Sequence, residues 1–503
     1  MRKLPKSFYS WPTIIGAMLA AVSFFLILFL ILVSFLFPGE VTQYLGLLTY
    51  IVLPVFLFLG LLLIPIGTWR KFKKDKKRLV QREVKFPRID LNDPAQRMIV
   101  FIFVLGSAIF ILFTALGSYE AFHYTESNKF CGTLCHSVMS PEYTTYHQSA
   151  HAKVSCVECH VGSGADWYVK SKLSGLYQVY ALLTHTYPTP IATPVHDLRP
   201  ARQTCEECHW PQKFYNRELI SKRYYLTDQN TTEWDITMLM KTGPEHEALG
   251  QRSGIHWHVN PDVKIEYVAA TEKRDTIALV KYTNLKTGKV TIYRDTANRF
   301  SSNQIDTLEH RVMDCLDCHN RPSHDFKSPI RFFDEAMNAG KIPGNLPDVK
   351  MEAMDILYNN SFPSLDSANR FIRSQFTEYY QMMYPEIYDT SKALIDTTIK
   401  NIQIAYKQNV FPSMKASWKA HPNYIGHLES NGCFRCHNGS FVDKEGSSIS
   451  RDCNICHEIK AQGTPGNMEF AGNKASLEFK HPIGIKGKWK KLACVKCHKN
   501  LYE

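Results

Sequence analysis

All fourteen cysteines of this 503-residue chain lie in seven pairs, and a histidine follows the second cysteine of every pair. Six pairs have the spacing Cys-x-x-Cys-His, whereas the first pair has three intervening residues. The pattern leaves no cysteine for a disulfide. In chain order, the seven motifs are Cys131/Cys135-His136, Cys156/Cys159-His160, Cys205/Cys208-His209, Cys315/Cys318-His319, Cys433/Cys436-His437, Cys453/Cys456-His457 and Cys494/Cys497-His498.

Two kinds of site use paired cysteines with this spacing. Two Cys-x-x-Cys units can hold a tetrahedral zinc ion through four thiolates, but such a site does not require a histidine after each pair. With 20 histidines in 503 residues, chance would place one there seven times with a probability on the order of one in 10^10, so the motif indicates c-type haem attachment. We therefore expect seven covalent haems, each held by two thioether bonds and a proximal histidine. These histidines are His136, His160, His209, His319, His437, His457 and His498.

Three apolar runs near the N-terminus, residues 12–37, 41–69 and 98–119, contain no charged side chain. Each is longer than the roughly 20 residues that a helix needs to cross a bilayer. The first run could instead be a signal peptide, but it is too long and no small-residue cleavage site follows it. We therefore predict three transmembrane helices.

Charge predicts the topology of these helices. Residues 70–97 contain eleven Lys or Arg against four acids, whereas the loop FPGE between the first two helices has no basic residue. The positive-inside rule then places the N-terminus and the basic loop in the cytoplasm. Everything after about residue 120 is expected in the periplasm of a bacterium, on the outer side of its inner membrane.

The net charge of +12 does not indicate nucleic-acid binding. Residues 1–97 carry fourteen bases and five acids, so the remaining 406 residues contribute only +3. This small excess of positive charge does not indicate the basic surface that binds a nucleic acid. Because each ferric haem adds about one negative charge, seven haems would bring the periplasmic part to roughly −4.

The motifs divide the periplasmic part into haem-bearing segments and two long intervals. The first interval contains runs rich in branched and aromatic residues, 256–270, 276–284 and 289–295, which predict strands. The second contains residues 366–383 and 390–409, where the apolar spacing predicts helices. Thr390 and Ser391 are expected to start the latter helix.

The expected fold is a membrane-anchored multihaem cytochrome c, with a mostly irregular α+β periplasmic domain organised around the haems. The expected domains are a transmembrane anchor (1–122, with the basic loop 70–97), a first haem domain (123–212), a β-rich insertion with the fourth haem (213–330), a helical insertion (331–420) and a C-terminal haem domain (421–503).

A second axial ligand is usual for an electron-transfer haem. Thirteen histidines lie outside the motifs. His256 and His258 alternate with Trp257, so on a strand both would face the same side and one could ligate an iron. The complete set of distal candidates is His151, His324, His427, His481, His256, His258, His185 and His196. The histidines expected to be structural are His123, His147, His246, His310 and His421.

Residues 98–212 resemble a known family. The segments FCGTLCHSVMSPEYTTYHQSAHAKVSCVECHVG, WYVKSKLSG and LRPARQTCEECHWP are similar to the NapC/NirT family of membrane-anchored quinol dehydrogenases. The whole chain resembles, more loosely, the ImcH-type inner-membrane cytochromes. The resemblance implies that menaquinol is oxidised at the outer face of the inner membrane. Electrons would then pass to periplasmic c-type cytochromes or reductases, in anaerobic or extracellular respiration.

The same resemblance implies a quinol pocket and a changed first haem. Either Met139 or His136 would be the proximal ligand of the first haem, and Lys172, with Lys170 as the alternative, would line the pocket. Where the family has an aspartate, this chain has Tyr177, Gln178 and Val179, so Asp166 or a haem propionate would take its place. The candidate quinol-binding residues are Lys172, Lys170, Asp166, Gln178 and Trp167. The helix expected over 165–183 has the aromatic residues of an interfacial segment, and its lysines could instead simply reach the headgroups.

Three functions remain for comparison. The first is a quinol:cytochrome c type oxidoreductase in contact with the quinol pool and the bilayer. The second is an electron relay that receives electrons from a membrane partner and has no quinone site. The third, a terminal reductase of small nitrogen compounds, is disfavoured because the chain lacks the Cys-x-x-Cys-Lys motif that marks a pentahaem nitrite reductase.

Overall fold

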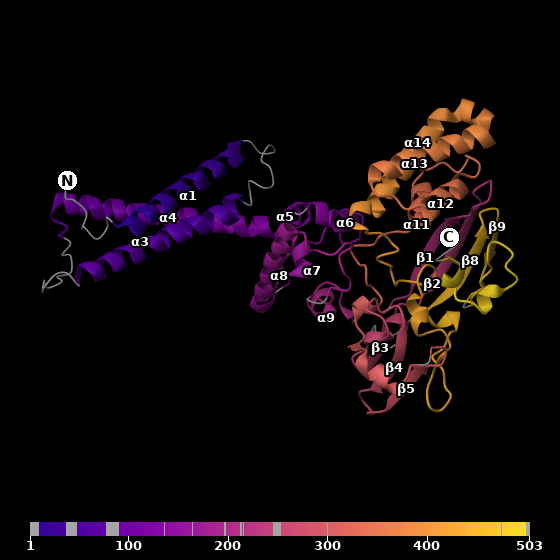
Figure 1. Ribbon diagram of the computed structural model, residues 1–503. Coiled ribbons are helices and arrows are strands. Elements are labelled where there is room, and N and C mark those ends of the chain that lie inside the picture. Colours follow the sequence, from indigo (N-terminus) through magenta and orange to yellow (C-terminus); the bar gives the residue numbers. More distant parts are fainter. Residues whose placement is uncertain are drawn as a thin grey trace. The chain divides into compact units, whose positions relative to one another are not determined.

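The computed structural model describes residues 10–36, 48–76, 90–134, 136–162, 164–195, 198–211, 214, 216–244, 253–298, 300–473 and 475–498. The chain forms two compact units, residues 1–136 and 137–503 (Figure 1). Each unit is described by itself below.

The first unit is helical. It contains α1 (Trp11–Leu36), a π-helical turn η2 (Leu48–Val52), α3 (Leu53–Lys76), α4 (Pro94–Glu126) and the short α5 (Asn128–Thr133). Three of these helices are long and apolar enough to cross a membrane, over Trp11–Leu32, Leu53–Lys74 and Pro94–Glu126. The three helices predicted from the apolar runs are therefore present, although α3 begins twelve residues after the start of its run at residue 41.

Small residues bring α1 and α3 close together. A Cβ atom added to Gly60 would lie 2.6 Å from the backbone nitrogen of Ala20, and one added to Gly16 would lie 2.7 Å from the carbonyl oxygen of Gly60. Thr13 and Ser23 of α1 are buried as well. Such small-residue interfaces allow the backbones of membrane helices to approach and gain van der Waals contact.

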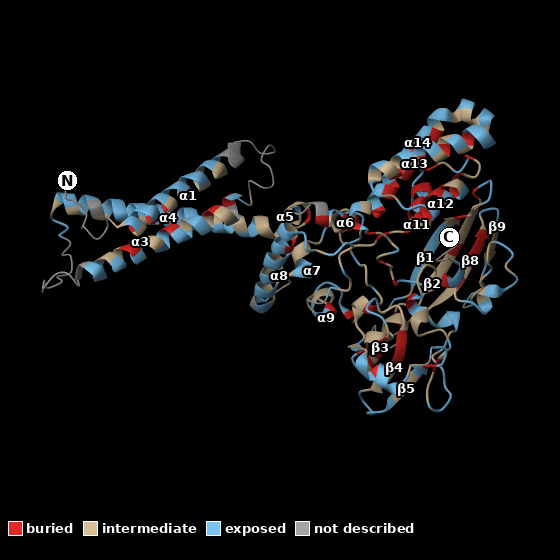
Figure 2. Ribbon diagram, in the orientation of Figure 1, coloured by how far each residue is buried: buried red, intermediate tan, exposed pale blue. Residues whose placement is uncertain are grey.

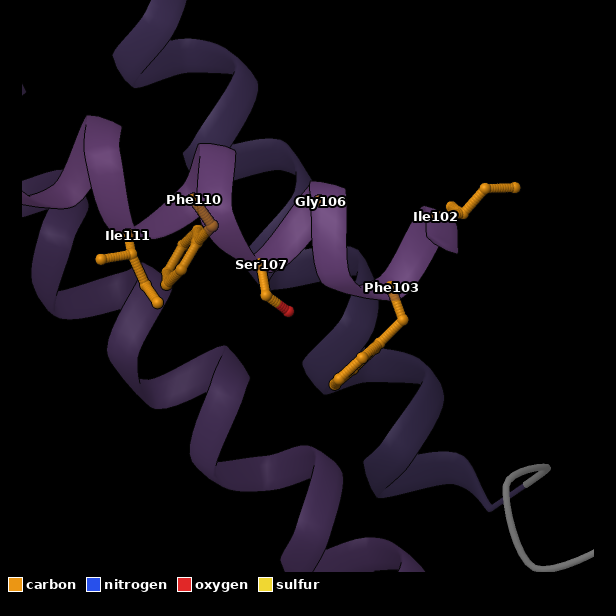
Figure 3. Close-up of a pocket in the computed structure, with 6 residues that line it drawn as sticks. All are labelled: Ile102, Phe103, Gly106, Ser107, Phe110 and Ile111. Carbon is orange, nitrogen blue, oxygen red and sulfur yellow. The ribbon is translucent and has the colours of Figure 1, made fainter. Parts of the chain in front are cut away.

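Helix α4 has a defined start and an apolar surface. The Asp93 side chain accepts a hydrogen bond from the amide of Ala95 at 2.9 Å, and Pro94 occupies the first helical position, both favourable at a helix N-terminus. Figure 3 shows a shallow hollow along this helix where Gly106 and Ser107 lie between Phe103 and Phe110. The exposed apolar side chains of α4 suit a lipid environment.

The second unit begins with helices around the second and third motifs. They are α6 (His136–Tyr146), α7 (Cys156–His160), α8 (Ala165–Thr184) and α9 (Ala201–Cys205). Next come β1 (Glu218–Tyr225), β2 (Glu233–Met240), η4 (Ile255–Val259), β3 (Val263–Ala269), β4 (Ile277–Asn284), β5 (Val290–Asp295), α10 (Ser302–Thr307), β6 (Glu309–Val312) and η5 (Cys315–Asp317). The strands predicted within 256–270, 276–284 and 289–295 are β3, β4 and β5.

The C-terminal motifs complete two antiparallel sheets. The last elements are η6 (Pro412–Met414), η7 (Gly432–Arg435), β7 (Phe441–Val442), η8 (Cys453–Ile455), β8 (His457–Thr464), β9 (Asn467–Phe470), η9 (Lys488–Lys490) and α15 (Val495–His498). One sheet has the strand order β1-β2-β8-β9 and the other the order β6-β3-β4-β5-β7. Each sheet therefore joins strands of 213–330 to strands of 421–503.

Four helices form the largest apolar core. They are α11 (Pro329–Asn338), α12 (Val349–Asn359), α13 (Leu365–Met383) and α14 (Pro385–Asn409). Figure 2 shows many buried residues in α11 and α12, and Phe333, Phe376 and Ile399 are fully enclosed. The element α14 consists of two helices that meet at a kink, because Ser391 inside it has non-helical angles (φ −123°, ψ 24°). The second of these helices starts just after Ser391, which agrees with the start predicted at Thr390 or Ser391, and a shorter helix from Pro385 precedes it.

A buried ion pair connects β1 to these helices. Lys350 of α12 is 1 % exposed, and its Nζ donates to the carboxylate of Asp334 in α11 and to the carbonyl of Tyr225 in β1. Burial raises the pKa of Asp334 to about 6 although the lysine lies beside it. The pair therefore holds two charges in an apolar environment, where each depends on the other.

Candidate functional site

The second, third, fourth, fifth and seventh motifs each form about one turn of helix, whereas His457 of the sixth motif begins strand β8. In the third, fourth, fifth and seventh motifs, the histidine amide donates to the carbonyl of the first cysteine at 2.8 to 2.9 Å. Residues three and four apart share a face of such a turn. The Cys-x-x-Cys-His spacing thus directs both sulfurs and the imidazole toward the same side, as attachment of one flat macrocycle requires.

The described motif cysteines differ in how far the polypeptide covers them. Five motifs have one exposed cysteine each, and these are Cys159, Cys208, Cys433, Cys453 and Cys497. The thioether bonds expected at the motif cysteines stay predictions.

Six motif histidines face a second histidine from outside the motifs. The ring centroids lie 5.8 to 6.4 Å apart. A first-row metal binds an imidazole nitrogen at about 2 Å, so two imidazoles on opposite sides of one ion have centroids about 6 Å apart. The pairs are His160–His324, His209–His151, His319–His256, His437–His258, His457–His427 and His498–His481. Their spacing fits a haem iron.

Backbone carbonyls orient most of the second histidines. The Nδ1 atom of His324 lies 2.9 Å from the carbonyl oxygen of Glu142, and that of His151 lies 3.1 Å from the carbonyl of Pro322. The same contact is made by His256, His258 and His481 with the carbonyls of Thr242, Ile255 and Ile483. A hydrogen bond from Nδ1 leaves Nε2 free to bind a metal. Burial also lowers the pKa of His324 to about 4, which keeps the ring neutral.

The structure brings six of the eight distal candidates to a motif. His151, His324, His427 and His481 each face one motif histidine. His185 lies exposed at the end of α8, beside the ring of Tyr187 at 6.4 Å. His196 lies outside the described residues.

One expectation about these candidates is wrong. His256 and His258 were predicted to lie on a strand with their rings on the same side, but they belong to the 3₁₀ helix η4. A 3₁₀ helix turns by one third of a circle per residue, so the two rings point in different directions. Each reaches a motif of its own, His319 and His437 respectively.

The histidines expected to be structural have other partners. The ring of His123 lies 4.3 Å from Tyr119 and that of His147 lies 4.5 Å from Tyr143. His310 Nε2 lies 3.1 Å from the carbonyl oxygen of Ile305. His421 is 2 % exposed, and its ring lies 5.1 Å from that of Phe326. His246 lies outside the described residues.

The second, third and fourth motifs are neighbours in space. α7 packs against α9, and α9 packs against η5. Burial raises the pKa of Cys159 in the second motif, and the nearby charge of Cys208 in the third adds to the increase. The side chain of Cys205 in the third motif lies beside that of Cys315 in the fourth. These contacts bring the third motif between the second and the fourth.

The remaining motifs continue this order. Arg435, between the cysteines of the fifth motif, donates to the carbonyl of Asp317 in the fourth. Phe434 of the fifth motif stacks on His427, which faces the sixth motif, at 4.4 Å. Arg451, beside the sixth motif, donates to the carbonyl of Leu492 beside the seventh at 3.2 Å. The six motifs therefore lie in space in the order of the sequence.

The sequence analysis did not predict a buried polar cluster around Arg321. Arg321 donates to the Oγ1 of Thr193 and lies against His421 Nδ1, both at 2.9 Å. Arg321 Nε, His421 Nε2 and Glu142 Oε2 are buried and have no hydrogen-bond partner among the residues that the structure describes. Buried polar atoms normally have partners, and the two nitrogens fit the carboxylate of a haem propionate. The position of Arg321 between His319 and His324, in CHNRPSH, was the available signal.

The first motif is described in part. Cys131 lies half-buried in α5, and Met139 lies half-buried in α6. Cys135 and the side chain of His136 lie outside the described residues. Among the residues that the structure does describe, no group of three or more His, Cys, Asp or Glu side chains is arranged to hold a metal ion.

The candidate quinol-binding residues lie on α8. The Nζ atom of Lys170 lies 4.5 Å from the ring centre of Trp167, and that of Lys172 lies 4.9 Å from the ring centre of Tyr168. Lys172 is half-buried, whereas Lys170 is exposed. Asp166 is exposed in the first turn, and the Gln178 amide donates to Ser174 at 3.5 Å.

The same helix carries an exposed apolar stripe. Its residues recur every three or four positions and are 55 to 75 % exposed. An apolar face of this kind is typical of a helix that lies in the membrane interface. The residues are Val169, Leu173, Leu176, Tyr180 and Leu183.

Known proteins that are similar to this chain are c-type cytochromes. Residues 93–203 match the NapC/NirT cytochrome c family, N-terminal region. Over 492 residues the chain is 42 % identical to the cytochrome c-type protein ImcH of Geobacter sulfurreducens, an alignment that covers 97 % of this chain and 95 % of that protein. Over 115 residues it is 29 % identical to the cytochrome c-type protein NrfH of Wolinella succinogenes, covering 22 % of this chain and 62 % of that protein. No solved structure matches the chain.

Proposed function

Because the chain belongs to the NapC/NirT family of membrane-anchored cytochromes c, we propose that it oxidises menaquinol and passes the electrons through seven c-type haems to periplasmic acceptors. The observation that carries this proposal is the set of six histidine pairs, one at each motif from the second to the seventh. Covalently bound c-type haem follows from the family, and the count of seven follows from the motifs.

The histidine pairs favour electron transfer over substrate chemistry. A haem iron with two histidine ligands changes between the ferric and ferrous states and has no free position for a substrate. The protein supplies both ligands at six motifs, so these sites suit a relay. Their order in space provides a continuous route from the second motif to the seventh.

Quinol oxidation requires a site at the membrane surface that accepts electrons and protons. The exposed apolar stripe of α8 would place this helix at the interface, where a lipid-soluble quinol arrives. Lys172, half-buried beside Tyr168, would donate a hydrogen bond to a quinol oxygen. Asp166 or a haem propionate would take up the proton, with Trp167 and Gln178 beside the site and Lys170 as the alternative cation.

The first haem is the proposed entry point for electrons. Its motif contains one residue more than the others, so its attachment loop differs. We assign the proximal position to Met139 or His136. The basic loop 70–97 orients the anchor with the N-terminus in the cytoplasm and all motifs in the periplasm.

A second candidate function is a relay without a quinone site. It is favoured by the aromatic partners of Lys170 and Lys172, because Trp167 and Tyr168 stabilise these cations without a ligand. In that case α8 serves only as an interfacial anchor, and a membrane partner reduces the haems.

Anaerobic mixing with a menaquinol analogue separates the two candidates. The full chain in detergent is mixed with the quinol while the haem α-band is followed. Rapid partial reduction that is lost in Lys172→Ala and kept in Lys289→Ala, an exposed site before β5, supports the dehydrogenase. Reduction by dithionite without reduction by quinol contradicts it and leaves the relay.

A further inference from the structure

We propose that the lysine-rich surface around the seventh motif, residues 475–498, is the docking site of a soluble redox protein with an acidic surface. Electrons would leave the chain at this site. This inference rests on the proposed function in one respect, because it takes the motifs to form one route for electrons. It adds the place where the electrons leave the chain and the charge of the partner that accepts them.

The position of the seventh motif fits an exit. The contacts that order the motifs end here, where Arg451 beside the sixth motif binds the carbonyl of Leu492. The Cys497 side chain is exposed, and both histidines of this motif's pair, His481 and His498, are only half-buried. A haem held here would lie close to solvent, where a partner can approach it.

The charge of this segment differs from that of its surroundings. Residues 475–498 contain six lysines and one glutamate, a formal charge of +5. Because all residues after 97 together carry only +3, the rest of that part carries −2 before any haem is counted. One haem with ionised propionates adds about −1, so the segment stays positive while the rest of the periplasmic part becomes more negative.

Most of these lysines are available to a partner. All six are exposed. Lys480 pairs with Glu469, and Lys490 pairs with Glu478. The other four make no ion pair with any residue that the structure describes, and they are Lys486, Lys488, Lys491 and Lys496.

Apolar side chains lie among the lysines. Ile483 is 59 % exposed and Leu492 is 46 % exposed. Behind them, Phe479 packs edge-on against His481 at 6.2 Å and against Trp489 at 5.6 Å. A small apolar centre within a charged rim is the usual composition of an interface that forms and separates quickly.

These features select a partner of opposite charge. A positive rim attracts an acidic surface and accelerates its encounter, and it slows a basic one. The transfer would move one electron from the ferrous iron of the haem that His481 and His498 would hold to the oxidised centre of the partner. That iron would become ferric, the partner's centre would be reduced by one electron, and no bond would form or break.

Two blue copper proteins of opposite charge provide the test. The full chain in detergent is reduced with dithionite, freed of excess reductant, and mixed in a stopped-flow cell with acidic plastocyanin or basic pseudoazurin. Loss of the blue copper band gives the second-order rate constant. Since dithionite loads the electrons, this test does not depend on quinol oxidation. A failure of the proposed dehydrogenase therefore remains distinguishable from a failure of the docking site.

The key variant reverses four charges, Lys486→Glu, Lys488→Glu, Lys491→Glu and Lys496→Glu. A control variant with the same net charge carries Lys392→Glu, Lys400→Glu, Lys407→Glu and Lys415→Glu, all at exposed positions in or just after α14. We expect the plastocyanin rate constant at low salt to fall by about tenfold or more in the first variant and by less than about threefold in the control. The pseudoazurin rate constant should not fall in the first variant.

Several results would overturn the proposal. One is an equal fall of the plastocyanin rate constant in both quadruple variants, and another is no fall of that rate constant in the first variant. A third is a faster reaction of the unaltered chain with pseudoazurin than with plastocyanin at low salt. If the first variant fails to incorporate its haems, carbodiimide cross-linking of plastocyanin to the unaltered chain replaces it. Cross-links within residues 475–498 support the docking site, and cross-links confined to other segments contradict it.

Discussion

The imidazole rings of His258 and His437 lie 5.8 Å apart and meet nearly at right angles, although one belongs to η4 and the other to the fifth motif. This pair joins the β-rich segment to the C-terminal motifs, as do the two sheets that combine strands from both segments. In the proposed function, haem ligation and folding are therefore coupled, because the second ligand would arrive only when distant segments have packed.

The first prediction concerns His258 as the distal ligand of the fifth haem. His258→Ala should convert one haem from a low-spin to a high-spin iron, because the sixth ligand is removed. Electron paramagnetic resonance and the near-infrared magnetic circular dichroism of the oxidised protein would measure the change. His310→Ala is the matched control, since the ring of His310 lies against the backbone carbonyl of Ile305 rather than against a motif histidine. An unchanged low-spin signal in His258→Ala would contradict the assignment.

The second prediction concerns the buried Arg321. If its unpartnered nitrogen binds a haem propionate, Arg321→Leu removes a positive charge close to one iron and favours the ferric state. We expect the midpoint potential of one haem to fall by roughly 60 mV, equivalent to about 1.4 kcal/mol for one electron.

Spectroelectrochemical titration measures the effect of Arg321→Leu. The exposed Arg373, paired with Asp396 at 2.7 Å, provides the control, and Arg373→Leu should leave every potential unchanged. Identical titration curves for Arg321→Leu and the unaltered protein would show that Arg321 binds no propionate.

Sequence reasoning recovered the parts of this molecule that depend on local patterns. The three apolar helices, the strands β3 to β5 and the helix α13 follow from periodicity and composition. His151, His324, His427 and His481 were identified because each lies near a motif in the chain.

The partners of these histidines could not be predicted in the same way. His324 follows the fourth motif but faces His160 of the second, because tertiary packing selects the pair. The two histidines of η4 were misassigned for a related reason. Their alternation with Trp257 matches a strand, whereas the chain forms a 3₁₀ turn whose rings reach two different motifs.

The third prediction concerns the packing of α1 against α3. A Cβ at Gly60 would lie 2.6 Å from the backbone nitrogen of Ala20, so Gly60→Ala must push the helices apart. Overpacking of this kind costs about 1–3 kcal/mol, and we expect a lower temperature of thermal aggregation in detergent. Gly106→Ala is the control, because a Cβ there would have no neighbour within 4 Å. Equal stability of the two variants would contradict the close approach.

The last prediction concerns the buried pair of Lys350 and Asp334. Lys350→Met leaves the Asp334 carboxylate buried without its counter-charge, which should cost about 3–5 kcal/mol of unfolding free energy near pH 7. The pKa of Asp334 is already raised to about 6 by burial, and loss of the lysine raises it further. A carboxyl group with a raised pKa in the folded state stabilises the fold at low pH and loses that contribution as the pH rises through the folded pKa. The destabilisation by Lys350→Met should therefore be larger at pH 8 than at pH 5.

This difference is measured as the thermal unfolding of the α11–α14 helices at both pH values, with hydrogen exchange of their amides as the readout. The double variant Lys350→Met/Asp334→Leu should recover most of the lost stability, because it removes the unpaired charge and keeps an apolar filling. Arg373→Met, which breaks an exposed pair, should cost no more than about 1 kcal/mol. A loss in Lys350→Met that is independent of pH would mean that the lysine acts through packing alone, since a buried, unpaired carboxylate must respond to protonation.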